Sequence, residues 1–148
     1  MKRLAVDIET DGLDAKEIYC VVARDLDEKR TYTYTSQNMQ HCKQLLESAD
    51  ILVFHNGVSF DAPVLKRLLG INIPLDKISD TLILSQLVNP VRDGGHSLEA
   101  WGKTLGYNKI DFDDWSSYSE EMLKYCIRDV EITEKIYNTL IPELKRFS

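Results

Sequence analysis

The sequence has few cysteines, no long apolar run and fewer basic than acidic residues. Its three cysteines, Cys20, Cys42 and Cys126, lie far apart and show no paired spacing. This argues against a zinc site or a disulfide framework and favours a reducing compartment. No apolar run reaches membrane-spanning length and the N-terminus lacks a signal-peptide pattern, so we expect a cytoplasmic protein with no membrane partner.

The charge balance limits how the chain can bind nucleic acid. The sequence has 18 basic and 24 acidic residues, and its formal net charge is −6. A protein that binds nucleic acid nonspecifically is usually basic. Either nucleic acid is not the substrate, or it is held locally and briefly, or a partner supplies the affinity. A metal site would account for part of the acidic excess.

What is present is the composition of one globular domain. The chain has 148 residues, of which 43% are hydrophobic and 28% are charged. The pattern predicts three strands, a helix, a strand and then helices, which indicates an α/β domain with a mixed sheet. Ser117 with Glu120 fits a capping box at the start of the last helix. The expected strands are 2–8, 17–24, 30–35 and 51–54, and the expected helices are 36–49, 59–69, 81–87, 97–105 and 119–140.

The first expected strand carries two carboxylates on one of its faces. Leu4, Val6 and Ile8 alternate and point to one side. Asp7 and Glu9 therefore share the other side, where they would repel each other and lose hydration. A divalent cation between them would relieve both effects. The alternative is a strand whose end emerges into solvent, and the pair taken alone favours that alternative.

Asp129 lies on the apolar side of the last expected helix. On a helical wheel it falls beside Met122, Ile132 and Ile136, and Tyr125 lies one turn earlier on the same side. The position of Asp129 in the middle of the helix excludes a capping role. A carboxylate there needs a partner or a metal ion.

Asp61 gives a similar signal near the start of another helix. Because Pro63 is tolerated only in a first helical turn, Asp61 fits an N-cap as well as it fits a ligand. Carboxylates from three segments, Asp7 with Glu9, Asp61 and Asp129, thus occupy buried-looking faces. Oxygen ligands without His or Cys suit Mg²⁺ or Mn²⁺. Four carboxylates suit a two-metal site of the kind that performs phosphoryl transfer.

The same residues occur in three short motifs. They are Asp7-Ile8-Glu9-Thr10, His55-Asn56-Gly57-x-x-Phe60-Asp61 and Tyr125-x-x-x-Asp129. In this order they resemble the three exonuclease motifs of the DEDD superfamily. Tyr125 marks the Tyr-type subgroup, because the His-type subgroup would carry His where this chain has Lys124.

A wider likeness is to the proofreading 3′–5′ exonuclease domain of T-odd bacteriophage family A DNA polymerases. It includes Asp80-Thr81-Leu82 and the segment Ser97–Gly102. The resemblance covers nearly the whole chain. It implies a single 3′–5′ exonuclease domain over residues 1–148, with an RNase H-like fold in which helices flank a mixed five-stranded sheet.

The resemblance also implies roles for the motif residues. Asp7 would bridge two divalent cations, Mg²⁺ or Mn²⁺. Glu9 and Asp129 would complete the ion that holds the attacking water, and Asp61 would support the second ion. Tyr125 would orient the nucleophile. The implied substrate-binding residues are Thr10, Leu13 and Asn56.

The function implied is removal of nucleotides from the 3′ end of DNA, preferably single-stranded DNA or a frayed end. The sequence ends directly after the last expected helix, so we expect proofreading beside a separate DNA polymerase. A phage-encoded chain would act in the host cytoplasm. Three alternatives stay open: an exoribonuclease resembling RNase D, a non-catalytic module that binds a polymerase, and a purely structural cation site.

Overall fold

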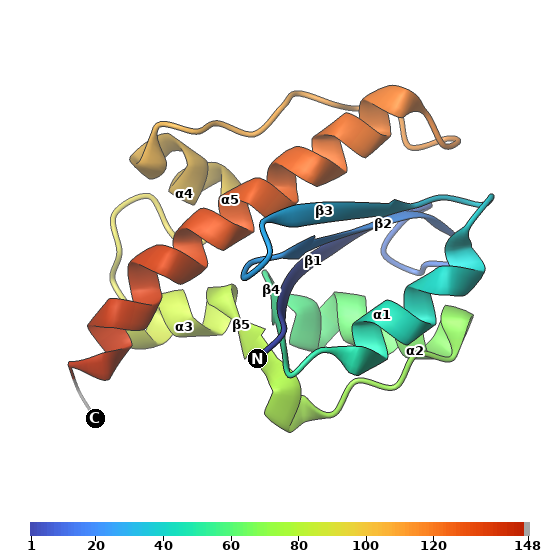
Figure 1. The fold of residues 1–148 in the computed structure, drawn as a ribbon. Coiled ribbons are helices and arrows are strands. Elements are labelled where there is room, and N and C mark those ends of the chain that lie inside the picture. The colour runs from blue at the N-terminus through green and yellow to red at the C-terminus, as the bar shows by residue number, and fades with distance from the viewer. Residues whose placement is uncertain (147–148) are drawn as a thin grey trace.

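The computed structural model describes residues 1–146 and contains a mixed five-stranded sheet with helices on both faces (Figure 1). The strand order is β3-β2-β1-β4-β5. The first three strands form an antiparallel meander, and β4 and β5 run parallel to β1. This confirms the expected fold class. The strands are β1 (Arg3–Thr10), β2 (Ile18–Asp25), β3 (Arg30–Tyr34), β4 (Ile51–Phe54) and β5 (Ile78–Asp80).

The helices occur where the sequence pattern placed them, with different ends. They are α1 (Cys42–Ser48), α2 (Ala62–Leu69), α3 (Thr81–Val88), α4 (Leu98–Leu105) and α5 (Glu120–Lys145). The expected helix over 36–49 is shorter, because Met39–His41 forms a 3₁₀ turn before α1. The expected capping box is wrong. Ser119, and not Ser117, caps α5 by accepting a hydrogen bond from the Met122 amide at 3.1 Å.

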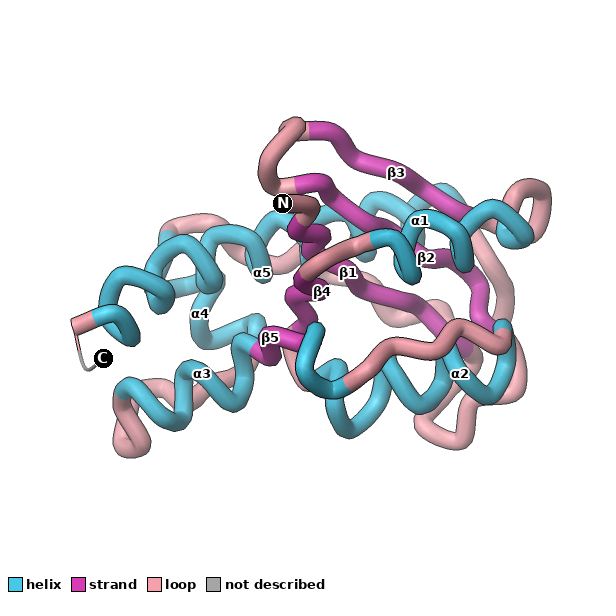
Figure 2. Tube along the Cα trace, turned by 60° about the horizontal axis from the view of Figure 1, so that its bottom comes forward, coloured by secondary structure: helices cyan, strands magenta, loops and turns pink. Residues whose placement is uncertain are grey.

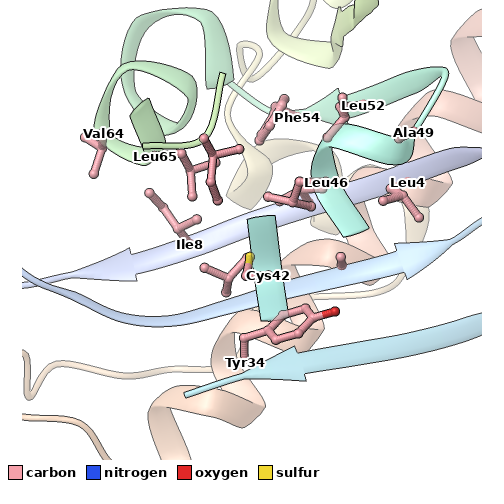
Figure 3. Packing of buried hydrophobic residues seen from close by; sticks show 14 of the residues in the cluster. Leu4, Ile8, Tyr34, Cys42, Leu46, Ala49, Leu52, Phe54, Val64 and Leu65 are labelled. Carbon is pink, nitrogen blue, oxygen red and sulfur yellow. The ribbon is translucent and has the colours of Figure 1, made fainter. Parts of the chain in front are cut away.

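One face of the sheet packs against α1 and α2. Leu4, Val6 and Ile8 of β1 are buried there, as their alternation predicts. Figure 3 shows Leu4 and Ile8 facing side chains from α1 and α2. Since this apolar row fills the core, the alternate row of β1 must face the other side of the sheet.

The other face is covered by α5, which runs across β1 and β2 (Figures 1 and 2). Cys126 and Val130 of α5 pack with Ala5 of β1 and Val22 of β2 in a second apolar cluster. A third cluster, around Trp101 and Ile136, joins α4 to α5. Asp7 and Glu9 therefore lie in the layer between β1 and α5. None of the helices described is both long and apolar enough to cross a membrane.

A tight turn after β4 sets the position of the next carboxylate. Asn56 adopts a left-handed conformation with φ of 69°. A Cβ on Gly57 would lie 2.2 Å from the Phe54 side chain, so this position requires glycine. The carboxylate of Asp80 accepts hydrogen bonds from the Asn56 amide at 2.9 Å and the Val58 amide at 3.1 Å. These hydrogen bonds fix the turn after β4. The π-helical turn Gly57–Asp61 follows it and leads into α2.

Candidate active site

Four carboxylates from three elements meet at the end of β1. Asp7 and Glu9 belong to β1, Asp61 ends the turn before α2, and Asp129 lies in the middle of α5. Glu9, Asp61 and Asp129 are buried, with 8%, 5% and 4% of their surface exposed. The parallel pairing of β1 with β4 brings the Asp61 segment beside β1, and α5 brings Asp129 to the opposite side.

Burial raises the pKa values of these carboxyl groups, and neighbouring carboxylates of the cluster add to the rise for Asp7 and Glu9. Burial raises the pKa of Asp7 well above its usual range, and the neighbouring Glu9, Asp61 and Asp129 raise it further. Burial, followed by the charge of Asp129, raises the pKa of Glu9 to about 9. Burial likewise raises the pKa of Asp61 to about 7 and that of Asp129 to about 6. The cluster of four carboxyl groups therefore forms a site that a bound cation would stabilise.

The side chains of Asp61 and Asp129 differ in their hydrogen bonds. In the described chain, the Asp61 side chain accepts no capping hydrogen bond at the start of α2. The structure therefore does not show the Asp61 side chain capping α2, which was the alternative to a ligand role. Oδ1 of Asp129 is buried, and within residues 1–146 it has no hydrogen-bond partner. Because a buried unpaired carboxylate oxygen is costly, this oxygen is suited to ligate a cation.

A thiol lies directly against Asp7. The Cys126 Sγ is 3.5 Å from the Asp7 carbonyl oxygen and 3.6 Å from its Oδ2. Ligand atoms of Asp7, Glu9 and Cys126 all lie within 4.8 Å of one another. Burial raises the pKa of Cys126 well above its usual range, so the group stays a thiol and donates weakly to Asp7. Sequence reasoning missed this contact, although Cys126 lies three residues before Asp129 on the same side of α5.

Tyr125 stands at the rim of the carboxylate cluster in an aromatic group. Its ring lies 5.4 Å from the ring of Trp115 and 5.7 Å from that of Phe112, measured between centroids. Burial raises the pKa of Tyr125, and the hydrogen bond from Lys109 opposes the rise. The phenol thus keeps its proton near neutral pH and is available as a hydrogen-bond donor.

An apolar groove opens beside Glu9 and Thr10. It has a volume of about 370 Å³ and is lined in part by Leu13, Phe60 and Trp115. The Leu13 side chain is 94% exposed. Trp115 lies outside the three sequence motifs, and the structure places it in the lining of this groove. Phe60 was missed as a groove residue, although it precedes Asp61 in the second motif.

The remaining two predicted substrate residues lie in tight turns. Thr10 is buried, and its hydroxyl donates to the Gly12 carbonyl at 2.9 Å, which shapes the turn that presents Leu13. Asn56 has an exposed side chain, and its backbone amide is held by Asp80. The structure brings Thr10 and Leu13 to one groove, and it leaves Asn56 outside that groove's lining.

The residues present fit divalent cations. Asp7, Glu9, Asp61 and Asp129 offer hard oxygen ligands in one place, and the buried oxygen of Asp129 lacks a partner. Burial raises the pKa values of all four, and repulsion between neighbouring carboxylates adds to the rise for Asp7 and Glu9; a bound dication would relieve both effects. The cationic side chain paired with Asp129 is Lys109, at 3.1 Å. Lys109 belongs to none of the three sequence motifs.

Comparison with known proteins gives one family and a set of shared folds. The model of a family described as 3′–5′ exonuclease matches residues 1–145. The DNA-directed DNA polymerase of Enterobacteria phage T3 is 26% identical over 191 residues, which cover 97% of this chain and 27% of the polymerase. The chain thus spans about a quarter of that relative's length.

Two solved structures share the fold at low sequence identity. The EXO domain of Nibbler from Aedes aegypti has a TM-score of 0.75 and 13% identity, over 99% of this chain and 80% of that chain. RNase D from Trypanosoma brucei has a TM-score of 0.71 and 15% identity, over 94% of this chain and 57% of that chain. At these identities the likeness concerns the arrangement of strands and helices only.

Proposed function

Because the chain belongs to the 3′–5′ exonuclease family, we propose that it hydrolyses the terminal phosphodiester bond at the 3′ end of DNA and releases one nucleotide at a time. The observation that carries this proposal is the convergence of Asp7, Glu9, Asp61 and Asp129 beside Tyr125. This arrangement would supply metal ligands and a hydrogen-bond donor at one point, which suits metal-assisted hydrolysis of a phosphodiester.

The four carboxylates would hold two divalent cations, Mg²⁺ or Mn²⁺. When bound, these ions supply an activated water and stabilise the charge on phosphorus and on the leaving 3′-oxygen. Asp7, whose carboxyl group interacts electrostatically with the other three, would serve both ions. Glu9 and Asp129 would serve one ion, and Asp61 would support the other.

Tyr125 would orient the reacting groups by donating its proton in a hydrogen bond. Its raised pKa argues against a role as a general base near neutral pH. Its ring is fixed by contacts with Phe112 and Trp115, so the hydroxyl is held in place before the substrate arrives. A fixed donor of this kind is effective because little rearrangement is needed during the reaction.

The apolar groove favours an unpaired terminal base. Leu13, Phe60 and Trp115 offer apolar and aromatic surface next to Glu9, and stacking on such surface requires a base that is free of its complement. A single strand, or the frayed end of a duplex, meets that requirement. Thr10 contributes by shaping the turn that carries Leu13. The exposed Asn56 side chain would contact the backbone of the bound DNA strand.

The experiment follows cleavage of single-stranded DNA oligonucleotides labelled at the 3′ or the 5′ end, with Mg²⁺, Mn²⁺ or EDTA. We expect the 3′ label to leave as mononucleotide and the 5′ label to show a shortening ladder. EDTA and Asp7→Ala should each abolish both signals. Cleavage that persists in EDTA would contradict the metal-dependent mechanism. Absence of cleavage, with Mg²⁺ still raising the melting temperature of wild type alone, would favour a structural cation site or a non-catalytic module.

A second candidate substrate is RNA. It is favoured by the shared fold with Trypanosoma brucei RNase D. Leu13 and Phe60 of the apolar groove have no polar group that would recognise a 2′-hydroxyl. Matched DNA and RNA oligonucleotides, compared by kcat/KM, would separate an exonuclease for DNA from an exoribonuclease.

A DNA polymerase is the partner that we propose. The net charge of −6 gives the chain little general affinity for DNA, and the phage relative that it matches is a DNA polymerase almost four times as long as the matched part. A polymerase would bring mispaired 3′ ends to this site, which amounts to proofreading. If the chain alone degraded long DNA processively at physiological salt, dependence on such a partner would be wrong.

A further inference from the structure

Lys109 makes the ion pair that reaches the carboxylate cluster. Its Nζ lies 3.1 Å from Oδ2 of Asp129. Among the ion pairs within residues 1–146, this is the one that involves a carboxylate of the candidate site. The Asp129 side chain is 5% exposed and that of Lys109 is 24% exposed, so the pair is shielded from water far more than an ordinary surface pair.

The same ammonium group also contacts Tyr125. Its Nζ lies 4.6 Å from the centre of the Tyr125 ring, within the range of a cation–π contact. Lys109 and Tyr125 both line a second groove of about 370 Å³, on the side of Phe112. One lysine therefore touches both side chains that α5 contributes to the reaction.

The backbone around Lys109 is tied to α5 by its two preceding residues. The Tyr107 hydroxyl donates to Glu131 at 3.0 Å, and Arg128 Nε donates to the Asn108 carbonyl at 2.7 Å. Arg128 also lies over the Tyr107 ring, 3.4 Å from its centre. Three consecutive residues thus bind to one stretch of α5, which fixes where the Lys109 side chain begins. A free surface lysine has no such anchoring.

Lys109 binds one of the two oxygens of the Asp129 carboxylate. Oδ2 accepts the hydrogen bond from Lys109, while the buried Oδ1 has no partner in the part of the chain described. A hydrogen bond to one oxygen fixes the rotation of the carboxylate and leaves the other oxygen available at a defined place. Groups that hold metal ligands in this way contribute to affinity and activity although they do not touch the metal.

We infer that Lys109 is a positioning residue for the reaction, which orients Asp129 toward a divalent cation and Tyr125 toward the attacked phosphate. This inference rests on the proposed function of the same site. It extends that function, because the three exonuclease motifs of the sequence do not include Lys109. The ammonium also offsets part of the negative charge of the cluster before metal binds.

The test compares Lys109→Met, Lys109→Arg and wild type on a short single-stranded DNA oligonucleotide with Mg²⁺. We expect Lys109→Met to lower kcat about 10–100-fold, with KM changed by less than about threefold, because substrate binding does not depend on this contact. Lys109→Arg should recover part of kcat, since it keeps the positive charge. The matched control is Lys43→Met, which removes the exposed ion pair with Glu47 far from the site and should leave kcat unchanged.

A chemical rescue makes the test sharper. All three cysteines are buried, so Lys109→Cys can be alkylated at its new thiol with 2-bromoethylamine to rebuild an ammonium at nearly the same distance. We expect the alkylated variant to regain kcat to within about threefold of wild type, because the rebuilt ammonium can again position Asp129 and Tyr125. Recovery with iodoacetamide, which adds no positive charge, would overturn the inference.

A second readout does not depend on turnover. If Lys109 holds Asp129 in the orientation that binds the cation, Lys109→Met should weaken Mg²⁺ binding, so Mg²⁺ should raise the melting temperature of this variant by less than it raises that of wild type. An equal or larger increase would contradict the inference, as would an unchanged kcat in Lys109→Met. Wild type that cleaves no substrate would instead count against the proposed function, so the two failures can be told apart.

Discussion

The ring of Trp115 meets the ring of Tyr125 edge to face, with centroids 5.4 Å apart and an angle of 81° between the planes. Trp115 also lines the apolar groove that contains Leu13 and Phe60. The residue that would bind a terminal base thus touches the residue that would orient the nucleophile. A correctly seated base and a correctly placed Tyr125 hydroxyl therefore depend on the same contact.

The first prediction concerns Trp115→Ala. Stacking of a base on an aromatic ring contributes about 1–3 kcal/mol, so we expect KM for a single-stranded oligonucleotide to rise about tenfold. We also expect a smaller fall in kcat, because Tyr125 loses a neighbour that fixes its ring. Leu13→Ala should raise KM without the fall in kcat. Steady-state kinetics on one oligonucleotide measures both values, and Leu75→Ala is the control, because Leu75 is 71% exposed and lies outside the groove. An unchanged KM in Trp115→Ala would exclude base stacking at this groove.

The second prediction is that Asp7→Asn stabilises the metal-free protein while it abolishes activity. Removing one of four repelling carboxylates should raise the free energy of unfolding in EDTA by about 1–2 kcal/mol. Loss of a metal ligand should lower kcat/KM by about 10³-fold or more, which corresponds to several kcal/mol of lost transition-state stabilisation.

Thermal or denaturant unfolding in EDTA measures the stability. Asp76→Asn removes the same charge from an exposed position and serves as the control. A lower free energy of unfolding for Asp7→Asn in EDTA would contradict this prediction. It would show that favourable contacts stabilise the Asp7 carboxylate in the absence of a cation.

The third prediction concerns pH. Burial, and then the charge of Asp129, raises the pKa of Glu9 to about 9, while burial raises those of Asp61 and Asp129 to about 7 and about 6. The unfolded chain ionises these groups near pH 4. Between about pH 4 and pH 9 the folded state therefore binds more protons than the unfolded state, and stability in EDTA should fall as pH rises.

Melting temperatures across this range, with EDTA or with Mg²⁺, measure the effect. The increase caused by Mg²⁺ should grow with pH, because the ligands must lose their protons to bind it. Glu9→Gln removes the highest of the three pKa values and should flatten the profile in EDTA above pH 7. A Mg²⁺ effect that shrinks as pH rises would be inconsistent with carboxylate ligands.

Much of the fold could be predicted from local patterns. The alternation of Leu4, Val6 and Ile8 gave the correct buried face of β1, and the helical period gave α5 and the inward direction of Asp129. β5 was missed because Ile78–Asp80 has only three residues and a mixed composition, so it carries no periodicity. Its existence depends on pairing with β4, which is a tertiary interaction. The fifth strand was expected only through the family resemblance.

The candidate site could be predicted only in part. The carboxylates were found because charged residues on apolar faces stand out in a sequence. Lys109 and Trp115 were not assigned to the site because the loop between α4 and α5 has no regular period, and its path is set by contacts with α5. The prediction that Ser117 caps α5 was wrong for a related reason. Ser117 fits the capping-box pattern with Glu120, whereas Ser119 has Met122 at the corresponding position, and the geometry of the chain entering α5 makes Ser119 the cap.

The last prediction concerns the three cysteines. Cys20, Cys42 and Cys126 are all fully buried, and burial raises the pKa values of Cys42 and Cys126, the first to about 12. Since the thiolate is the reactive form, iodoacetamide should modify the native protein very slowly at pH 8 and should leave its activity intact. Mass spectrometry after treatment counts the modified thiols, and the same treatment in denaturant should modify all three. If activity were lost as fast as an exposed thiol reacts, Cys126 would have to be accessible beside Asp7, which would imply that α5 separates from β1 in solution on the timescale of the reaction.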